Sequence, residues 1–429
     1  MNDYFRFLLR RISEMLWVKP LAICIISIAV AFLTKMADQM PILELAPKVK
    51  AETIETLLSI ISASMLVIAV FAVGSMLSAY QSASNAATPR SFTLVLADDV
   101  SQNALSTFIG AFIFSIVAQI ALMNGYYGDA GRFALFAITI FVFALVIFGF
   151  IRWVDRIAKL GRLSTIIEKV ELATEQSLCR RLAQPFMRGV KAKGRTDGLP
   201  VYGADIGYIQ RIDIAALQSV AEKENMQIEV ASLPGKFATP DMPLMYVRFA
   251  STSGHAAVDQ INTMHDKLTD AFVIGKNRTF DDDPRFGLIV LSEIASRALS
   301  PAVNDPGTAI GIIGSLVRLL APCVSTQLEK KESPDVQYDR VAVPEVCLED
   351  MFDDAFNPIA RDGAAMIEVI IRLQKALHTL ASLGDENMQK TAMVHARLVL
   401  AYAETSLPIT ADLDKLRSVS TFIENAADK

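Results

Sequence analysis

The stretch that decides the fold runs from Phe133 to Ile151 and reads FALFAITIFVFALVIFGFI. It carries no charged residue, and about 20 apolar residues in a helix are enough to cross the hydrocarbon core of a bilayer. A helix satisfies its own backbone hydrogen bonds in that environment, so such a run is typical of a membrane span. Arg152 and Trp153 follow it, a cationic and aromatic pair suited to the membrane interface.

Three more stretches nearer the N-terminus have the same character. Thr56 to Tyr80 and Ala104 to Met123 contain no charge, and Leu16 to Met36 has only Lys19 and Lys35, near its ends, where long side chains reach the headgroups. The overall composition agrees, with 52% hydrophobic residues, 20% charged residues and a mean hydropathy of +0.37. The sequence therefore predicts four transmembrane helices, at about 18–36, 56–80, 104–123 and 133–152.

Basic residues near the ends of these spans predict the orientation. Nine Lys or Arg residues lie on the side of the two chain ends, and four lie on the other side. Basic residues favour the cytoplasmic side. We therefore expect an inner-membrane protein with both termini in the cytoplasm, and the lipid bilayer as its first partner.

Residues 1–17 place their apolar side chains on one helical stripe, with Arg6 and Arg10 facing elsewhere. This pattern predicts an interfacial amphipathic helix, or else an extension of the first span.

The content of the spans bears on mechanism. Coupled transporters usually hold an ionisable side chain at bilayer depth, and the three uncharged spans have none. The second span instead carries Ser64, Phe71, Ser75 and Ser82 on one helical face. These four are candidates for lining a pore, and the alternative is ordinary packing between helices.

The pattern changes after the fourth span, where short alternating segments replace the long apolar runs. We expect a connecting helix and linker at 156–200, a small α/β subdomain at 201–252, and a mainly helical domain at 253–429 with an acidic linker at about 327–345. The strands of the subdomain are predicted at Tyr202 to Ile212, Gln227 to Leu233 and Leu244 to Phe249. The fold class is thus an α-helical polytopic membrane protein followed by a mixed α/β, mainly helical cytoplasmic domain.

Two helices of this second half have clear start signals. Asp283-Pro284 and Asp305-Pro306 each combine a good N-cap with proline at the first helical position. Acidic residues 281–283 are more typical of a solvated helix start than of a divalent-cation site. The polar and charged residues around these two helix starts are candidates for contacting a partner: Arg278, Asp283, Glu293, Arg297, Asn304 and Asp305.

Chemical motifs are lacking. The sequence has no GxxxxGK[ST], GxSxG, HExxH, GxGxxG or CxxC element, and its four histidines and four cysteines have no metal-ligand spacing. We therefore expect no catalytic residue, no metal and no cofactor, and we interpret the cysteines as buried, reduced thiols. The acidic second half argues against a nucleic-acid partner.

Five strings, taken in order, resemble the landmarks of a family of predicted bacterial membrane proteins known as domain of unknown function 2254: TPRSF (88–92), SQNALSTFIG (101–110), GYIQRID (207–213), RTFDDDP (278–284) and RALSPAVNDPGTA (297–309). The resemblance covers almost the whole chain. It implies a bacterial inner membrane and supports the four-span topology, and it brings no catalytic residues with it.

Two functions of different classes fit these features. The leading hypothesis is a channel-like pore formed by a homo-oligomer and regulated by the cytoplasmic domain, since four spans alone rarely enclose a path. The alternative is a membrane-anchored sensor or scaffold whose cytoplasmic domain binds a partner or a ligand. An enzyme ranks third, because no nucleophile with a base, metal cluster or phosphate loop is present.

Overall fold

The computed structural model describes residues 17–39, 47–91, 93–94, 99–159, 162–194, 197–250, 255–322 and 336–425. The predicted amphipathic helix at 1–17 lies outside this set, apart from Trp17. The chain divides into two compact units: an N-terminal unit, Met1–Ile166, and a C-terminal unit, Ile167–Lys429.

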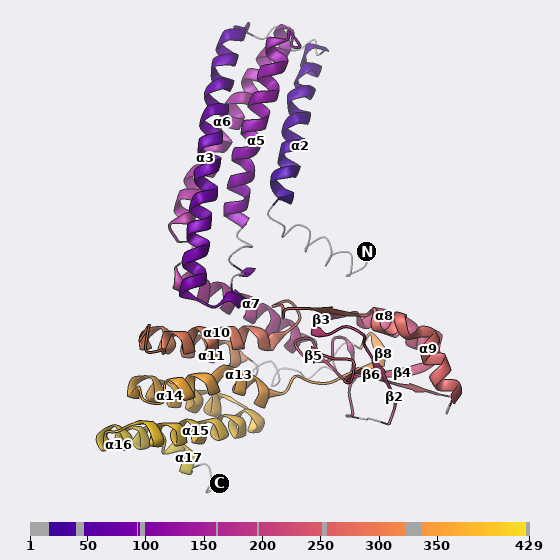
Figure 1. Ribbon diagram of the computed structural model, residues 1–429, viewed down its shortest axis with the longest axis vertical. Coiled ribbons are helices and arrows are strands. Elements are labelled where there is room, and N and C mark those ends of the chain that lie inside the picture. Colours follow the sequence, from indigo (N-terminus) through magenta and orange to yellow (C-terminus); the bar gives the residue numbers. More distant parts are fainter. Residues whose placement is uncertain are drawn as a thin grey trace. The chain divides into compact units, whose positions relative to one another are not determined.

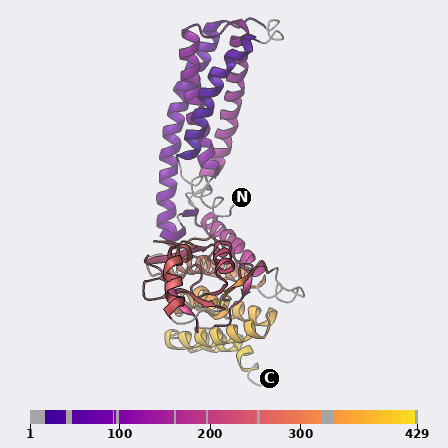
Figure 2. The ribbon, with the colours of Figure 1, turned by 90° about the vertical axis from the view of Figure 1, so that its right-hand side faces the viewer.

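Four long helices, running side by side, form the N-terminal unit (Figures 1 and 2). They are α2 (Val18–Leu33), which continues as the 3-10 turn η1 (Thr34–Gln39), α3 (Ala51–Ala86), α5 (Asp99–Met123) and α6 (Asp129–Ile157). Each is long and apolar enough to cross a membrane, which confirms the prediction of four such helices. The apolar segments are Val18–Gln39, Ala51–Ser82, Val100–Met123 and Asp129–Ile157.

Apolar side chains fill the space between these helices. Ile54, Leu58 and Leu135 belong to one buried cluster, and Phe108 and Trp153 to another. Trp153 is only 1% exposed, and its ring contacts those of neighbouring phenylalanines on three helices, with centroid distances of 6.0 to 6.3 Å. Trp153 therefore packs between helices of the unit, and its position at the membrane interface stays a prediction.

The loop before α6 is held by a side chain from another segment. The carboxylate of Asp38, in η1, accepts hydrogen bonds from the backbone N–H groups of Gly128 (2.9 Å) and Gly131 (2.6 Å). Asp38 thereby satisfies two donors at the helix start that have no partner within the helix. A Cβ atom on Gly131 would lie 2.7 Å from this carboxylate, so the close approach needs glycine there.

Helices make up most of the C-terminal unit and stack in layers in Figure 1. Asp283 and Asp305 cap α10 and α11 as predicted, accepting hydrogen bonds from the N–H groups of Arg285 (3.1 Å) and Thr308 (3.0 Å). The helices are α7 (Leu163–Ala183), α10 (Pro284–Ala298), α11 (Pro306–Leu320), α13 (Leu348–Asp362), α14 (Ile367–Leu383), α15 (Glu386–Ser406), α16 (Thr410–Val419) and α17 (Phe422–Asn425).

The sequence pattern from Phe352 to about Leu383 predicts a single helix, and the structure instead has two, α13 and α14. The first ends at Asp362, where Gly363 follows and a Cβ atom would lie 2.9 Å from the carbonyl oxygen of Ile359. Helix α14 then begins at Ile367 and buries its own apolar face, which includes Ile370, Leu373 and Leu377.

Two sheets complete the C-terminal unit. The five-stranded sheet has the order β1-β8-β4-β6-β2, parallel from β1 through β8 to β4 and antiparallel from β4 through β6 to β2. The three-stranded antiparallel sheet has the order β5-β3-β7. Helix α8 (Ile214–Lys223) packs on β8 and β4, and α9 (His255–Thr269) packs on β2. The strands are β1 (Gly189–Lys191), β2 (Leu199–Tyr202), β3 (Gly207–Ile212), β4 (Met226–Val230), β5 (Phe237–Ala238), β6 (Pro243–Phe249), β7 (Phe272–Gly275) and β8 (Tyr338–Val343).

Two sequence predictions about these strands are wrong. The predicted strand Tyr202 to Ile212 is split between β2 and β3, which belong to different sheets. Strand β8 lies inside the predicted acidic linker, because Val341 and Val343 are buried there and β8 pairs in parallel with β4, which precedes it by more than 100 residues. Such a distant partner leaves no local sequence pattern.

Candidate functional site

The predicted pore-lining residues lie together on the outer face of α3. Ser64, Phe71 and Ser82 are exposed and Ser75 is half-buried, as expected from helical spacings of 11 and 7 residues. Phe71 is 64% exposed, and one edge of its ring contacts Trp153. The four residues therefore share one face, and their role in a pore stays a prediction.

Arg278 and Asp283, predicted to be an exposed interaction site, form an internal ion pair. The guanidinium of Arg278 donates two hydrogen bonds to the Asp283 carboxylate, at 2.7 and 3.0 Å. The Asp283 side chain is only 2% exposed and also caps α10. Gly235, with φ +92°, leaves the room that this carboxylate occupies. The prediction of a solvated helix start is therefore wrong for Asp283, whose visible role is structural.

The neighbouring charges extend this pair into a balanced network that ties α7, α10 and α13 together. Arg285 donates a 2.6 Å hydrogen bond to Asp354 and also pairs with Asp350. Burial raises the pKa of Asp354 and of Asp282, although arginines beside each carboxylate oppose the rise. Burial lowers the pKa of Arg181, which lies near Asp282. Opposite charges lie close together here, which fits a stabilising role, and Nη1 of Arg181 is buried without a hydrogen-bond partner among the described residues.

The remaining predicted residues flank the turn between α10 and α11. Asn304 has a left-handed backbone with φ +51°, and its N–H donates to the carbonyl of Ser300 at 2.8 Å. Asp305 caps α11, so both shape the turn. Glu293 and Arg297 lie on α10, and their contact with a partner stays a prediction.

The thiols differ from the expectation of burial. Cys179 and Cys347 are exposed and Cys24 is half-buried, all three without a disulfide, while Cys323 lies outside the described residues. Within the described part of the chain, no three His, Cys, Asp or Glu side chains are grouped so that they could hold a metal ion.

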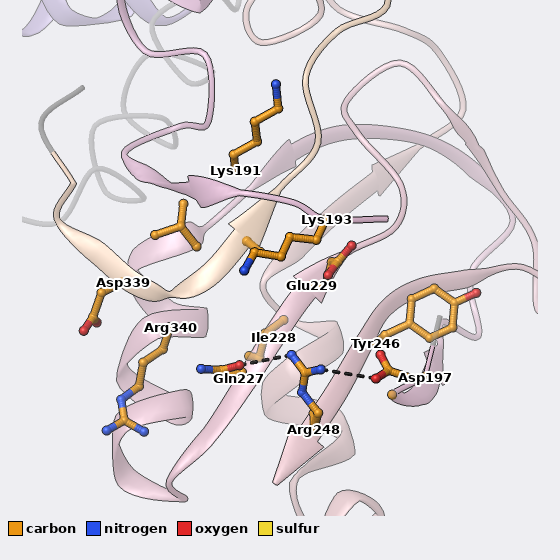
Figure 3. Close-up of a pocket in the computed structure, with 13 residues that line it drawn as sticks. Lys191, Lys193, Asp197, Gln227, Ile228, Glu229, Tyr246, Arg248, Asp339 and Arg340 are labelled. Carbon is orange, nitrogen blue, oxygen red and sulfur yellow. Dashed lines mark hydrogen bonds and ion pairs between the residues drawn. The ribbon is translucent and has the colours of Figure 1, made fainter. Parts of the chain in front are cut away.

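A polar hollow of about 160 Å³ lies on the five-stranded sheet (Figure 3). It arises from the alternation of side chains along the strands. On β4, Ile228 and Val230 are buried in the core while Gln227 and Glu229 alternate with them, and on β6 Tyr246 and Arg248 alternate with buried Met245 and Val247. The residues around the hollow are Val190, Lys191, Lys193, Asp197, Gly198, Gln227, Ile228, Glu229, Tyr246, Arg248, Asp339, Arg340 and Ala342.

The side chains around the middle of the hollow in Figure 3 are those of Lys193, Gln227, Glu229 and Arg248. Arg248 donates hydrogen bonds to Asp197 (3.3 Å) and to the amide oxygen of Gln227 (3.1 Å). Lys193 is exposed and follows β1, next to Gly194, whose φ of +68° turns the chain. Two cations thus meet an amide and a carboxylate on one sheet face.

The other cations of the hollow point away from its middle in Figure 3. Lys191 pairs with Glu345 at 3.1 Å, and Arg340 donates to the side chain of Asn225 at 2.9 Å. The hollow is thus lined by four cations, Lys191, Lys193, Arg248 and Arg340, and by three carboxylates, Asp197, Glu229 and Asp339. The arrangement suits a small polar molecule with an anionic group, which Lys193 and Arg248 would hold.

The sequence interpretation did not single out the hollow. A local signal exists in the alternating cations of the run KAKGRTDG (191–198). The other members come from β4, β6 and β8, up to about 150 residues away along the chain, so their meeting depends on the sheet order.

Four apolar helices followed by a unit with two sheets and a helical stack define a helical membrane protein with a large extramembrane part. The family model described as "Predicted membrane protein (DUF2254)" matches residues 13–379. The chain therefore belongs to this family of predicted membrane proteins with a domain of unknown function, which confirms the resemblance seen in the sequence.

Curated relatives share only part of their length with this chain. Uncharacterized protein Mb1321c of Mycobacterium bovis and uncharacterized protein Rv1290c of Mycobacterium tuberculosis are each 30% identical over 146 residues. The match covers 34% of this chain and 26% of each relative, so the chain spans about a quarter of the curated proteins that it matches. No solved structure matches the chain.

Proposed function

We propose that this protein is a membrane-anchored sensor whose C-terminal unit binds a small anionic molecule in the hollow of the five-stranded sheet. The observation that carries this proposal is the meeting of Lys193, Arg248 and Gln227 on one open sheet face. Four apolar helices supply the anchor.

The chemistry of the hollow favours a phosphate or a carboxylate as the anionic group. Asp197 is 64% exposed, so its ion pair with Arg248 is weak and a ligand displaces it at little cost. The planar guanidinium then offers two parallel N–H donors, and Lys193 adds a charged donor. The ring of Tyr246 also lines the hollow and offers a flat surface to the rest of the ligand.

A thermal-shift screen of the full-length protein in detergent, with phosphorylated and carboxylated metabolites, tests the proposal. We expect at least one such ligand to raise the melting temperature. Lys193→Ala then weakens its binding by roughly tenfold or more, since a hydrogen bond to a charged group contributes about 1.5–3 kcal/mol. Lys415→Ala changes another exposed lysine, on α16, and serves as the control. Stabilisation that is equal in wild type and Lys193→Ala contradicts the proposal.

A channel-like pore is the second candidate, favoured by the outer face of α3 with Ser64, Phe71, Ser75 and Ser82. Because apolar side chains fill the space between the four helices, a path would run between copies of the chain in a homo-oligomer. Conductance of the purified protein in planar bilayers tests it, and silence across salts, voltages and tension argues against a pore.

We further propose a bacterial inner membrane as the location, with both termini and the C-terminal unit in the cytoplasm. The excess of basic residues at one set of span ends supports this orientation. The exposed thiols of Cys179 and Cys347 make it testable with a membrane-impermeant maleimide. Labelling is expected only after the cells are permeabilised, and labelling of intact spheroplasts contradicts the orientation.

A further inference from the structure

The register of the five-stranded sheet places two arginines in one row on the face that carries the hollow. Gln227 on β4 pairs with Arg248 on β6. On the other side of β4, Ile228 pairs with Val341 of β8 in parallel register, so the residues just before them, Gln227 and Arg340, also lie side by side. Ile228 and Val341 are buried in the core, so the row lies on the opposite face of the sheet, where its three members line the hollow. Figure 3 shows Gln227 between the two arginines.

Hydrogen bonds direct the two guanidinium groups to different partners. Arg248 donates to the amide oxygen of Gln227 at 3.1 Å, whereas Arg340 donates to the amide oxygen of Asn225 at 2.9 Å. Strands β8 and β6 flank β4, and neighbouring strands lie about 4.8 Å apart, so the backbones that carry the two arginines are about 10 Å apart. The row therefore offers two cationic positions to a ligand.

The carboxylates near Arg340 leave its guanidinium accessible to an anion. Asp339 alternates with Arg340 along β8, and its carboxylate accepts a 2.8 Å hydrogen bond from Gln218 of α8. Glu229 lies on β4 one row further along the sheet, two residues after Gln227. A guanidinium has five N–H donors, and an anion that reaches Arg340 competes with a neutral amide oxygen for them.

We propose that the ligand of the hollow carries two separated anionic groups, one held by Lys193 and Arg248 and the other by Arg340. This inference rests on the proposed anion site and deepens it by naming the class of ligand. A guanidinium binds a phosphate or a carboxylate through two parallel N–H donors. Two such positions, about 10 Å apart across β4, select a bisphosphate or a dicarboxylate with an anionic group at each end.

Isothermal titration calorimetry of the full-length protein in detergent tests the inference with matched probes. Fructose 1,6-bisphosphate has two separated phosphates, and fructose 6-phosphate has one. Pyrophosphate has two adjacent phosphates and controls for total charge, because it is too short to reach both positions. Suberate and octanoate are the corresponding dicarboxylate and monocarboxylate, so the two pairs distinguish phosphate from carboxylate as the anionic group.

We expect the two-ended member of one pair to bind roughly tenfold or more tightly than its one-ended partner, because it makes a second charge-assisted contact. For the phosphate pair, it should exceed pyrophosphate by a similar factor. Arg340→Gln should abolish this gain and change the affinity for the one-ended probe by less than about twofold, since the second position is separate from the first. Lys193→Ala should weaken both probes. Arg361→Gln, which changes an exposed arginine on α13, is the control and should weaken neither.

Arg340→Lys keeps the charge without the planar fork, so it should retain part of the gain. It also carries the comparison if unliganded Arg340→Gln melts at a markedly lower temperature than the wild type. A gain of the same size in the wild type and in both Arg340 variants overturns the inference.

Failure of this inference and failure of the anion site give different results. Lys193-dependent binding of a one-ended probe, with no gain from a second anionic group in either pair, overturns the inference and leaves the proposed site intact. Binding of no probe, or binding that Lys193→Ala leaves unchanged, contradicts the proposed site and this inference with it.

Discussion

Polar side chains are used differently in the two units of the molecule. In the N-terminal unit the polar side chains within the spans bond to their own helix: the hydroxyls of Ser106 and Thr139 each donate to the carbonyl four residues earlier, at 2.7 Å, and longer-range bonds such as those of Asp38 lie at the span ends. In the C-terminal unit they bond between elements far apart in the chain, as in Arg285 with Asp354 and Arg318 with Glu171.

The difference follows from the surroundings of each unit. In hydrocarbon, a hydroxyl gains most from a carbonyl that is always within reach, and helices meet mainly through close packing of side chains. In water, burying apolar surface drives assembly, and charged pairs then fix how the buried elements fit together. The two units should therefore respond differently to the same kind of substitution.

The largest expected effect comes from removing a buried ring in each unit. Phe352 on α13 and Phe108 on α5 are both fully buried. Phe352→Ala should cost about 3–5 kcal/mol, because it loses transfer free energy and leaves a cavity. Phe108→Ala should reduce the free energy of unfolding by roughly half as much. The separated helix is also surrounded by apolar lipid, so the substitution removes packing contacts but no transfer from water.

Amide hydrogen exchange in α13 and in α5 of the full-length protein measures the loss of local stability caused by each of the two substitutions. Equal losses of stability in the two helices would contradict the proposed difference between the two units. They would imply that removal of apolar surface from water also drives packing around α5.

A smaller loss is expected at the ion pair inside the C-terminal unit. Asp283→Ala leaves the guanidinium of Arg278 without its carboxylate and removes the cap of α10. Breaking a buried pair in this way costs about 3 kcal/mol, which lowers the melting temperature of a unit of this size by roughly 10 °C. Glu404→Ala, which removes an exposed partner of Arg417, is the control and should leave melting nearly unchanged. A similar melting temperature for both variants would show that Asp283 is not the structural residue described above.

The smallest effect concerns pH. Burial alone would raise the pKa of Glu171, but hydrogen bonds from Arg318 and Ser315 outweigh it and lower the pKa below its ordinary value. The Glu171 carboxyl therefore binds its proton less tightly in the folded state than in the unfolded state. The ion pair of Glu171 with Arg318 thus stabilises the fold above about pH 4.5, and this contribution is lost as the pH falls through the lowered pKa. Glu171→Gln should reduce stability at pH 7 by a few degrees and flatten the decline between roughly pH 5 and 3. An unchanged acid profile in Glu171→Gln would exclude this pair as a source of the decline.

Local signals predicted much of the fold. The four apolar runs and the caps Asp283 and Asp305 depend on neighbours within a few residues, and the structure has each of them. Strand β8 and the break at Gly363 depend on partners distant in sequence or on a close backbone approach, and the sequence interpretation missed both.

The candidate site was less predictable for the same reason. Arg278 and Asp283 looked like exposed charges because each is polar and lies near a helix start, yet they satisfy one another inside the unit. Lys193 and Arg248 are separated by 55 positions, and β8 and β4 lie between their strands β1 and β6 in the sheet, so no spacing rule links them. Tertiary contacts decide whether a charged side chain pairs inside the protein or can contact a ligand.

Hydrogen–deuterium exchange of the full-length protein, with and without the most stabilising anion from the thermal-shift screen, tests the sensor proposal most directly. We expect slower exchange in the segments that surround the hollow, residues 189–194, 226–230 and 243–249, and unchanged exchange in α13 to α15. Protection that appears only outside the hollow, or that persists equally in Lys193→Ala, would contradict it.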